Sequence, residues 1–255
     1  MPASPTRLAA LKTEIAALER PSRADASVLP FGDVRLDGRL PGGGLPLGCW
    51  HEFAGEGLEL ETAAASAAFV ARLAAPLASR GELVWVLRRD DLHAPGLAGL
   101  GFPAERLIQV CARDDAEVLA VLEDALRTPG VVAAFGEAEA VDLTAGRRLQ
   151  LACEQTRATG FVLRRRPFGG GDQGRTGSAA ATRWGIAPAP SEPVPGEPGL
   201  GAPCWRVRLE RCRGGRNGAW ILQAWEDDDA AHPFRLVADL ADLDLAAQAP
   251  FKLAV

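Results

Sequence analysis

Short runs of consecutive apolar residues alternate with longer amphipathic segments along most of the chain. The runs have the length and composition of strands that are buried on both faces. They lie at residues 49–53, 83–87, 107–111, 131–135 and 161–163. Segments with a helical period separate them, at residues 62–79, 114–127 and 141–159. This alternation predicts an α/β protein with a mostly parallel sheet flanked by helices.

The pattern changes to a period of two near the C-terminus. Apolar and polar residues alternate at residues 204–212, 218–225 and 234–237. Gly214-Gly215 and Asn217-Gly218 lie between the first two of these segments. Alternation with such turns is typical of antiparallel hairpins. We therefore expect an antiparallel C-terminal edge on the sheet.

Residues 1–27 have the pattern of a helix followed by a linker. Pro21 ends the helical pattern, and the residues after it are polar and loop-like. The helix either folds against the main domain or docks on another protomer, so its apolar stripe is the predicted oligomer or partner surface. The stripe consists of Leu8, Leu11, Ile15 and Leu18. We place a core at residues 28–237. The remaining residues, 238–255, form a tail in which acidic and apolar residues alternate.

Two segments of the core lack a period. Residues 164–183 are rich in glycine and arginine, with Asp172 as their single acid, and predict a long mobile loop. Residues 187–203 are rich in proline and predict an exposed excursion or linker. The formal net charge of −5 and the pI near 5.4 give no global sign of nucleic-acid binding. Only local clustering of arginines can support such a function.

Cysteine, histidine and targeting signals narrow the class of protein further. The five cysteines are odd in number and widely spaced, so we expect buried free thiols in a reducing compartment. The three histidines lack the spacing of metal ligands, and we expect structural roles for them and no metal. No signal-peptide pattern begins the sequence, and Arg72 and Pro76 interrupt the most apolar helix. We therefore expect neither export nor a membrane span, and place the protein in the cytoplasm.

The stretch from residue 40 to residue 71 has the frame of a phosphate-binding P-loop. A Gly-rich turn leads into the strand at 49–53, and a loop with Gly55 precedes a helix that we expect to begin at Thr62. A strand, a glycine loop and a helix N-terminus are the parts that bind phosphate in such proteins. An ordinary strand-turn-helix segment that contains glycines but binds no phosphate would have the same sequence pattern.

The chemical groups of a P-loop are missing from this frame. Aligning G-x-x-x-x-G-K-[ST] from Gly55 puts Leu60 in place of the second glycine and Glu61 in place of the lysine. After Gly55, only Thr62, at the Ser/Thr position, matches the residue type that the motif requires. The only lysines in the chain, Lys12 and Lys252, are distant in sequence. A glutamate has the wrong sign of charge for a triphosphate.

Two separated motifs carry a resemblance to a known family. The segment LDGRLPGGGLPLG at residues 36–48 is similar to the pattern that precedes the P-loop strand in the RecA/RadA recombinase core, and the resemblance extends over residues 28–225. The stretch PGGGLPLG-x-x-HE at 41–52 and the segment SAAATRW at 178–184 resemble the ImuA family more closely. These are RecA-like accessory proteins of inducible translesion mutagenesis. The resemblance implies a RecA-like P-loop core.

The same resemblance implies that the machinery for ATP hydrolysis is lost. The recombinase glutamate that activates water falls at or near Arg89, and the aspartate that holds Mg²⁺ is replaced by Phe135-Gly136, with Glu137 one step late. With Glu61 at the lysine position, three requirements for ATP hydrolysis fail together. We therefore expect no enzyme activity, no cofactor and no catalytic residue.

The Gly/Arg loop matches the recombinase position that touches single-stranded DNA. The arginines that the resemblance assigns to phosphate contacts are Arg164, Arg165, Arg166, Arg175 and Arg183. A disordered surface loop whose arginines reflect codon bias is the alternative.

From these inferences, we expect the protein to be a non-catalytic scaffold in the SOS response to DNA damage. By resemblance, it links single-stranded DNA to a mutagenic polymerase assembly that contains an ImuB-like polymerase-family protein. RecA and a second copy of the chain are further candidate partners. The alternatives are a regulator resembling cell-division inhibitors, which would bind FtsZ, and a nucleotide-binding RecA-like ATPase.

Overall fold

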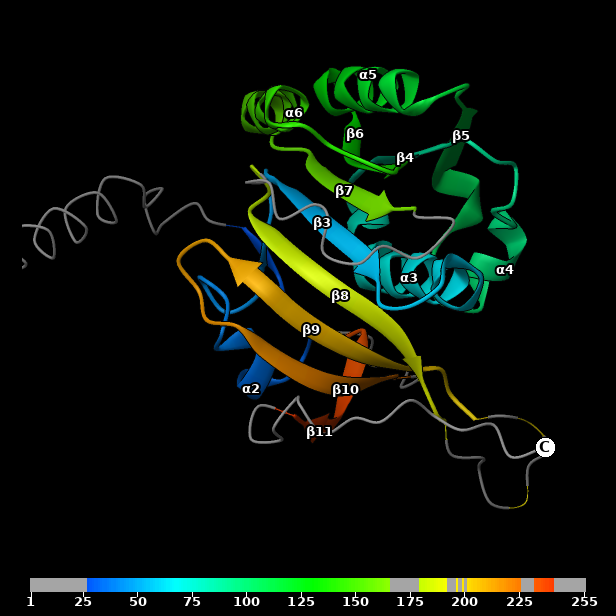
Figure 1. The fold of residues 1–255 in the computed structure, drawn as a ribbon, viewed down its shortest axis with the longest axis vertical. Helices are drawn as coiled ribbons and strands as arrows, with labels where there is room; N and C mark the ends of the chain where they lie inside the picture. Colours follow the sequence, from blue (N-terminus) through cyan, green and yellow to red (C-terminus); the bar gives the residue numbers. More distant parts are fainter. Residues whose placement is uncertain are drawn as a thin grey trace, which may run out of the picture.

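A single nine-stranded sheet organises the computed structural model, which describes residues 27–165, 179–191, 196, 199, 201–225 and 232–240 (Figure 1). The strand order across the sheet is β11-β10-β9-β8-β3-β7-β6-β4-β5. The strands are β3 (Trp50–Gly55), β4 (Glu82–Leu87), β5 (Leu107–Cys111), β6 (Val131–Ala138), β7 (Thr159–Arg164), β8 (Thr182–Ala189), β9 (Cys204–Cys212), β10 (Gly218–Ala224) and β11 (Phe234–Asp239). A separate two-stranded sheet pairs β1 (Val28–Leu29) with β2 (Leu45–Pro46).

The sheet is mixed in the way that the sequence predicts. Strands β8, β3, β7, β6, β4 and β5 pair in parallel, and β8 to β11 pair antiparallel in succession. Strand β8 joins the two parts because its neighbours run in opposite directions. The predicted α/β class, with a mostly parallel sheet and an antiparallel C-terminal edge, is therefore confirmed.

Helices cover both faces of the parallel part. Helix α3 (Glu59–Ala74) continues as the 3-10 helix η1 (Ala75–Arg80), and packs on one face through a core that includes Phe53, Phe69 and Trp184. Helices α5 (Asp115–Arg127) and α6 (Leu143–Thr156) pack on the opposite face, where Trp50 is buried (Figure 1). The remaining short elements are α2 (Val34–Asp37), α4 (Ala94–Ala98) and η2 (Ala104–Arg106).

Local capping decides where α5 and α6 begin and end. The carboxylates of Asp114 and Asp142 accept hydrogen bonds from backbone N–H groups in the first turns of these helices. Helix α6 ends where Arg157 adopts a left-handed conformation, with φ of 66°. The predicted helix at 141–159 was therefore too long at both ends.

Strand β8 is the main element that the sequence did not predict. Its residues were assigned to the end of the Gly/Arg loop at 164–183 and the start of the excursion at 187–203, and both assignments are wrong where they overlap β8. Arg183, Gly185 and Pro188 hide the strand pattern, but the strand pairs with β3 on one side and β9 on the other. Pairing on both sides outweighs a weak local preference for extended structure.

Several sequence predictions fall outside the described residues. These are the apolar stripe Leu8, Leu11, Ile15 and Leu18, the arginines Arg166 and Arg175, and residues 241–255 of the predicted tail. The tail was predicted to begin at residue 238, but strand β11 extends through Ala238 to Asp239. The five cysteines are free, as predicted, but Cys111 on the edge strand β5 is exposed rather than buried. The segment Glu59–Arg80 is long and apolar enough to cross a membrane, but 56% of its most apolar window is buried inside the protein, as in a core helix.

Candidate site at the carboxyl ends of the parallel strands

A tight turn joins β3 to α3 where a P-loop would lie. Helix α3 begins at Glu59, not at the predicted Thr62, and Leu58 precedes it in an extended conformation. Glu59 and Glu61 both lie in the first turn, where negative charge interacts favourably with the helix dipole. That interaction explains why the helix starts earlier than the apolar periodicity suggests.

The end of strand β3 and the first turn of α3 are in direct contact. Thr62 is buried, and its hydroxyl donates a hydrogen bond to the Leu58 carbonyl at 3.0 Å. A Cβ atom placed on Gly55 would lie only 2.1 Å from Thr62 Oγ1. The adjoining cavity, lined by Gly55, Gly57 and Thr62, has a volume of about 20 Å³, which is room for about one water molecule. A triphosphate does not fit there in this conformation.

The other two positions of the degenerate P-loop are exposed, although Glu61 stays close to the turn, since a Cβ atom on Gly57 would lie 3.4 Å from its Oε2 atom. Leu60 is 96% exposed and Glu61 is also exposed, since both lie on the outer side of α3. The alignment had placed Leu60 at the second glycine of the P-loop pattern. In the structure, Leu60 does not form part of a phosphate-binding turn. Only Gly55 and Thr62 come together among the four aligned residues.

A buried carboxylate joins three strands next to this turn. Glu52 of β3 accepts from Arg164 of β7 at 2.6 Å and from Arg183 of β8 at 3.2 Å. The side chains of Glu52 and Arg164 are only 3% and 8% exposed, so this ion pair is largely shielded from water. The negative charge of this one carboxylate compensates the positive charge of two guanidinium groups near the centre of the sheet.

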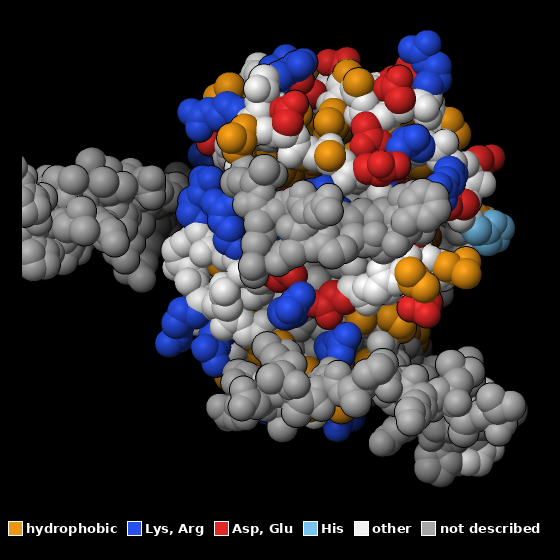
Figure 2. Space-filling model, viewed as in Figure 1, with side chains coloured by type: hydrophobic (Ala, Val, Ile, Leu, Met, Phe, Trp, Pro, Cys, Tyr) orange, Lys and Arg blue, Asp and Glu red, His pale blue; other side chains and the backbone are white. Residues whose placement is uncertain are grey.

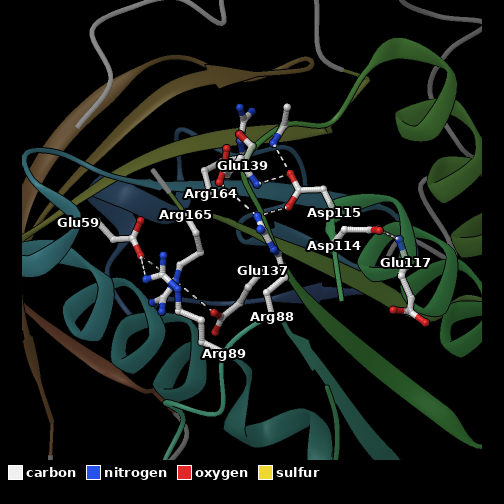
Figure 3. Close-up of polar contacts among 11 residues, drawn as sticks. Glu59, Arg88, Arg89, Asp114, Asp115, Glu117, Glu137, Glu139, Arg164 and Arg165 are labelled. Atoms are coloured by element: carbon white, nitrogen blue, oxygen red, sulfur yellow. Dashed lines mark hydrogen bonds and ion pairs between the residues drawn. The ribbon is translucent and has the colours of Figure 1, made fainter. Parts of the chain in front are cut away.

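A second cluster lies on the α3 side of the strand ends (Figure 3). Arg165 contacts Glu137 at 3.2 Å and Glu59 at 3.5 Å, and Arg89 contacts Glu59 at 3.1 Å. The indole N–H of Trp85 donates to Glu137 at 2.9 Å. Burial raises the pKa of Glu137, while the neighbouring Arg165 opposes that shift. Strand β6 runs to Ala138, so Glu137 lies within the strand rather than beyond the end predicted at Phe135.

Three of the five arginines assigned to DNA lie within the described residues, and each contacts a carboxylate. Arg164 and Arg183 contact Glu52, and Arg165 contacts Glu137, Glu59 and Asp91. A phosphate group that reached these three side chains would compete with carboxylates already in place.

Of the acidic members of these clusters, only Glu137 was singled out from the sequence, as the residue one step after the lost metal-holding aspartate, and none was predicted to pair with an arginine. Glu52 lies in the run WHEFA, and a charged residue inside a buried strand requires a partner, which is the one signal that the sequence offers. His51, its neighbour, is fully buried, and burial lowers its pKa to about 4. Its ring contacts Thr182 Oγ1 at 2.7 Å and the Pro46 carbonyl at 2.8 Å, which fits a neutral structural histidine.

The described residues contain no group of three or more His, Cys, Asp or Glu side chains placed to hold a metal ion. The charged side chains that the structure places at the strand ends are arginines and carboxylates. These groups hold one another, and the turn beside them is closed.

Comparison with known proteins identifies close relatives. The chain is 62% identical over 236 residues to Protein ImuA of Caulobacter vibrioides strain NA1000 / CB15N, a match that covers 90% of this chain and 97% of the relative. Protein ImuA of strain ATCC 19089 / CIP 103742 / CB 15 matches equally well. No protein-family model matches the chain. The crystal structure of SulA from Pseudomonas aeruginosa is 22% identical, covers 45% of this chain and 96% of its own, and has a TM-score of 0.40, too low to support any argument.

Proposed function

The chain belongs to the ImuA family, whose members act in DNA-damage-induced mutagenesis, and we propose that it serves there as a non-catalytic scaffold. In this role it holds single-stranded DNA beside a polymerase assembly that contains an ImuB-like protein. RecA and a second copy of the chain are further candidate partners, and the cytoplasm is the compartment where these components meet.

The closed turn between β3 and α3 is the observation that carries the non-catalytic part of this proposal. Thr62 packs on Gly55, and the cavity beside them has room for about one water molecule. Arg165 and Arg89 engage the carboxylates of Glu59 and Glu137 at the same strand ends. A scaffold protein requires a rigid core that supports its binding surfaces, and it does not require ATP hydrolysis.

We predict that the purified protein hydrolyses neither ATP nor GTP above background. The variant Glu61→Lys is expected to remain inactive too, because residue 61 lies on the exposed side of α3 and a lysine there does not reopen the turn. Release of inorganic phosphate with and without single-stranded DNA measures this. Turnover that Thr62→Ala abolishes would show that the nucleotide site is functional and contradict the non-catalytic scaffold.

The DNA-binding part of the proposal rests on the two arginines of the Gly/Arg loop that lie outside the described residues, Arg166 and Arg175. Arg164 and Arg183 are held by Glu52, and Arg165 by Glu137. The sequence between them contributes Arg166 and Arg175 without a neighbouring acid other than Asp172. We therefore assign the main phosphate contacts to Arg166 and Arg175 and a supporting structural role to the other three arginines.

We predict that affinity for single-stranded DNA falls steeply with salt and depends on this pair of arginines. Replacing Arg166 and Arg175 by serine removes two phosphate contacts, and should reduce the slope of log K against log salt by about 1.4. Fluorescence anisotropy of a labelled oligonucleotide over a salt series measures the slope. Arg35→Ser is the control, because Arg35 is an exposed arginine paired with Asp33 on α2. An unchanged slope in the double variant contradicts the assignment.

A further inference from the structure

A groove runs along the outer side of α3, and one end of it is formed by the cluster of Arg89, Arg165, Glu59 and Glu137 described above. It has a volume of about 600 Å³ and lies between α3 and α4. Alanines of α3, among them Ala63, Ala64 and Ala67, form one wall, and Leu97 and Leu100 lie on the other. Figure 2 shows hydrophobic side chains at the surface in this region. The lining is therefore mostly apolar and, on the α3 side, made of small residues.

A leucine in the first turn of α3 extends this apolar surface into solvent. Leu60 is 96% exposed and itself lines the groove. The described residues leave this apolar surface uncovered, so it is available to another molecule.

One end of the groove is lined by more acidic than basic side chains among the described residues. Glu59 is only 9% exposed, and its Oε1 atom contacts Arg89 and Arg165. Its Oε2 atom is buried and has no hydrogen-bond partner among the described residues. The charged residues that line this end are Glu59, Asp91 and Glu137 against Arg89 and Arg165, three acids to two bases. A buried carboxylate oxygen without a donor is unfavourable, and a cationic donor would stabilise it.

We propose that this groove receives an amphipathic helix of a partner protein, with an arginine or lysine set within the apolar stripe of that helix. The alanines of α3 allow a second helix to approach closely, and Leu60 and Leu97 provide contacts for leucine-sized side chains. The basic residue of the partner faces the acidic side chains at this end of the groove, among which Asp91 is the most exposed. This inference rests on the proposed scaffold function and specifies which surface takes the protein partner.

Two model peptides test the proposal with the full-length protein. Both are fluorescein-labelled amphipathic helices about 18 residues long with the same leucine stripe, long enough to form a stable helix when bound. One carries arginine in the middle of the stripe and the other carries glutamate. We expect the arginine peptide to bind about tenfold more tightly, with a Kd below about 100 μM by fluorescence anisotropy.

Variants locate the binding to the groove. Leu60→Asp should abolish binding of the arginine peptide, whereas Leu143→Asp should leave it unchanged. Leu143 is the matched control, because it is 62% exposed and also lies in the first turn of a helix, α6. Glu59→Gln should make the two peptides bind equally. Circular dichroism verifies that each variant is folded.

The outcomes separate this inference from the function on which it rests. Equal affinity for the two peptides, no binding at about 1 mM, or binding that Leu60→Asp does not weaken overturns the groove assignment. Binding of single-stranded DNA is measured on the same samples. If DNA binding is absent while the arginine peptide still binds as expected, the scaffold proposal fails in its DNA part and the groove assignment stands.

Discussion

Replacing Glu52 by glutamine is expected to lower the free energy of unfolding by about 3–5 kcal/mol, because the substitution removes the carboxylate that two guanidinium groups share in a largely buried cluster. Arg164 and Arg183 both donate to Glu52, and none of the three side chains is more than 16% exposed. Glutamine keeps the shape of glutamate but offers a single acceptor oxygen and no charge. Urea denaturation at neutral pH measures the change.

Glu210→Gln is the control for this prediction. Glu210 also faces an arginine, Arg208, at 2.8 Å, but the two side chains are 34% and 42% exposed. The loss of an exposed ion pair should cost less than about 1 kcal/mol. If the two variants are destabilised equally, the buried cluster does not hold β3, β7 and β8 together, and its arginines are free to bind other anions.

The sequence predicts most of the fold because the strands of the parallel part are continuous apolar runs. Residues 83–87 and 107–111 become β4 and β5 with little or no change in bounds. The predicted location of Trp50 and Trp85 on strands of one sheet is confirmed. The pattern fails at β8, where Arg183 and Gly185 interrupt the apolar run and pairing with distant strands decides the structure.

The candidate site was less predictable than the fold, because its partners are far apart in sequence. Glu52 is 112 residues from Arg164 and 131 residues from Arg183. No local pattern connects residues at such separations, and arginines in a Gly-rich segment resemble a solvent-exposed phosphate-binding loop. The glutamate within the run WHEFA shows that a buried partner must exist, but the sequence does not show which residue it is.

Substituting alanine for Gly55 is expected to destabilise the protein by about 1–3 kcal/mol, because the turn has no room for a side chain. The new Cβ would lie 2.1 Å from Thr62 Oγ1 and 2.7 Å from Thr62 Cβ, so either strand β3 or helix α3 must shift. Thr62→Gly removes both of these atoms and should cost about 1 kcal/mol through the glycine in the helix, together with the lost hydroxyl hydrogen bond to Leu58.

The double variant Gly55→Ala/Thr62→Gly decides whether the turn is closed in solution. It moves the side chain from one side of the contact to the other, so its destabilisation should be smaller than the sum of the single variants by about 1–2 kcal/mol. Urea denaturation of the four proteins gives this coupling energy. A coupling energy near zero would mean that β3 and α3 are separated at Gly55, and the turn would then have space for a phosphate group. Nucleotide binding would in that case be the simpler explanation for the P-loop frame. The proposal of a non-catalytic scaffold would then no longer be supported, because it depends on the closed turn.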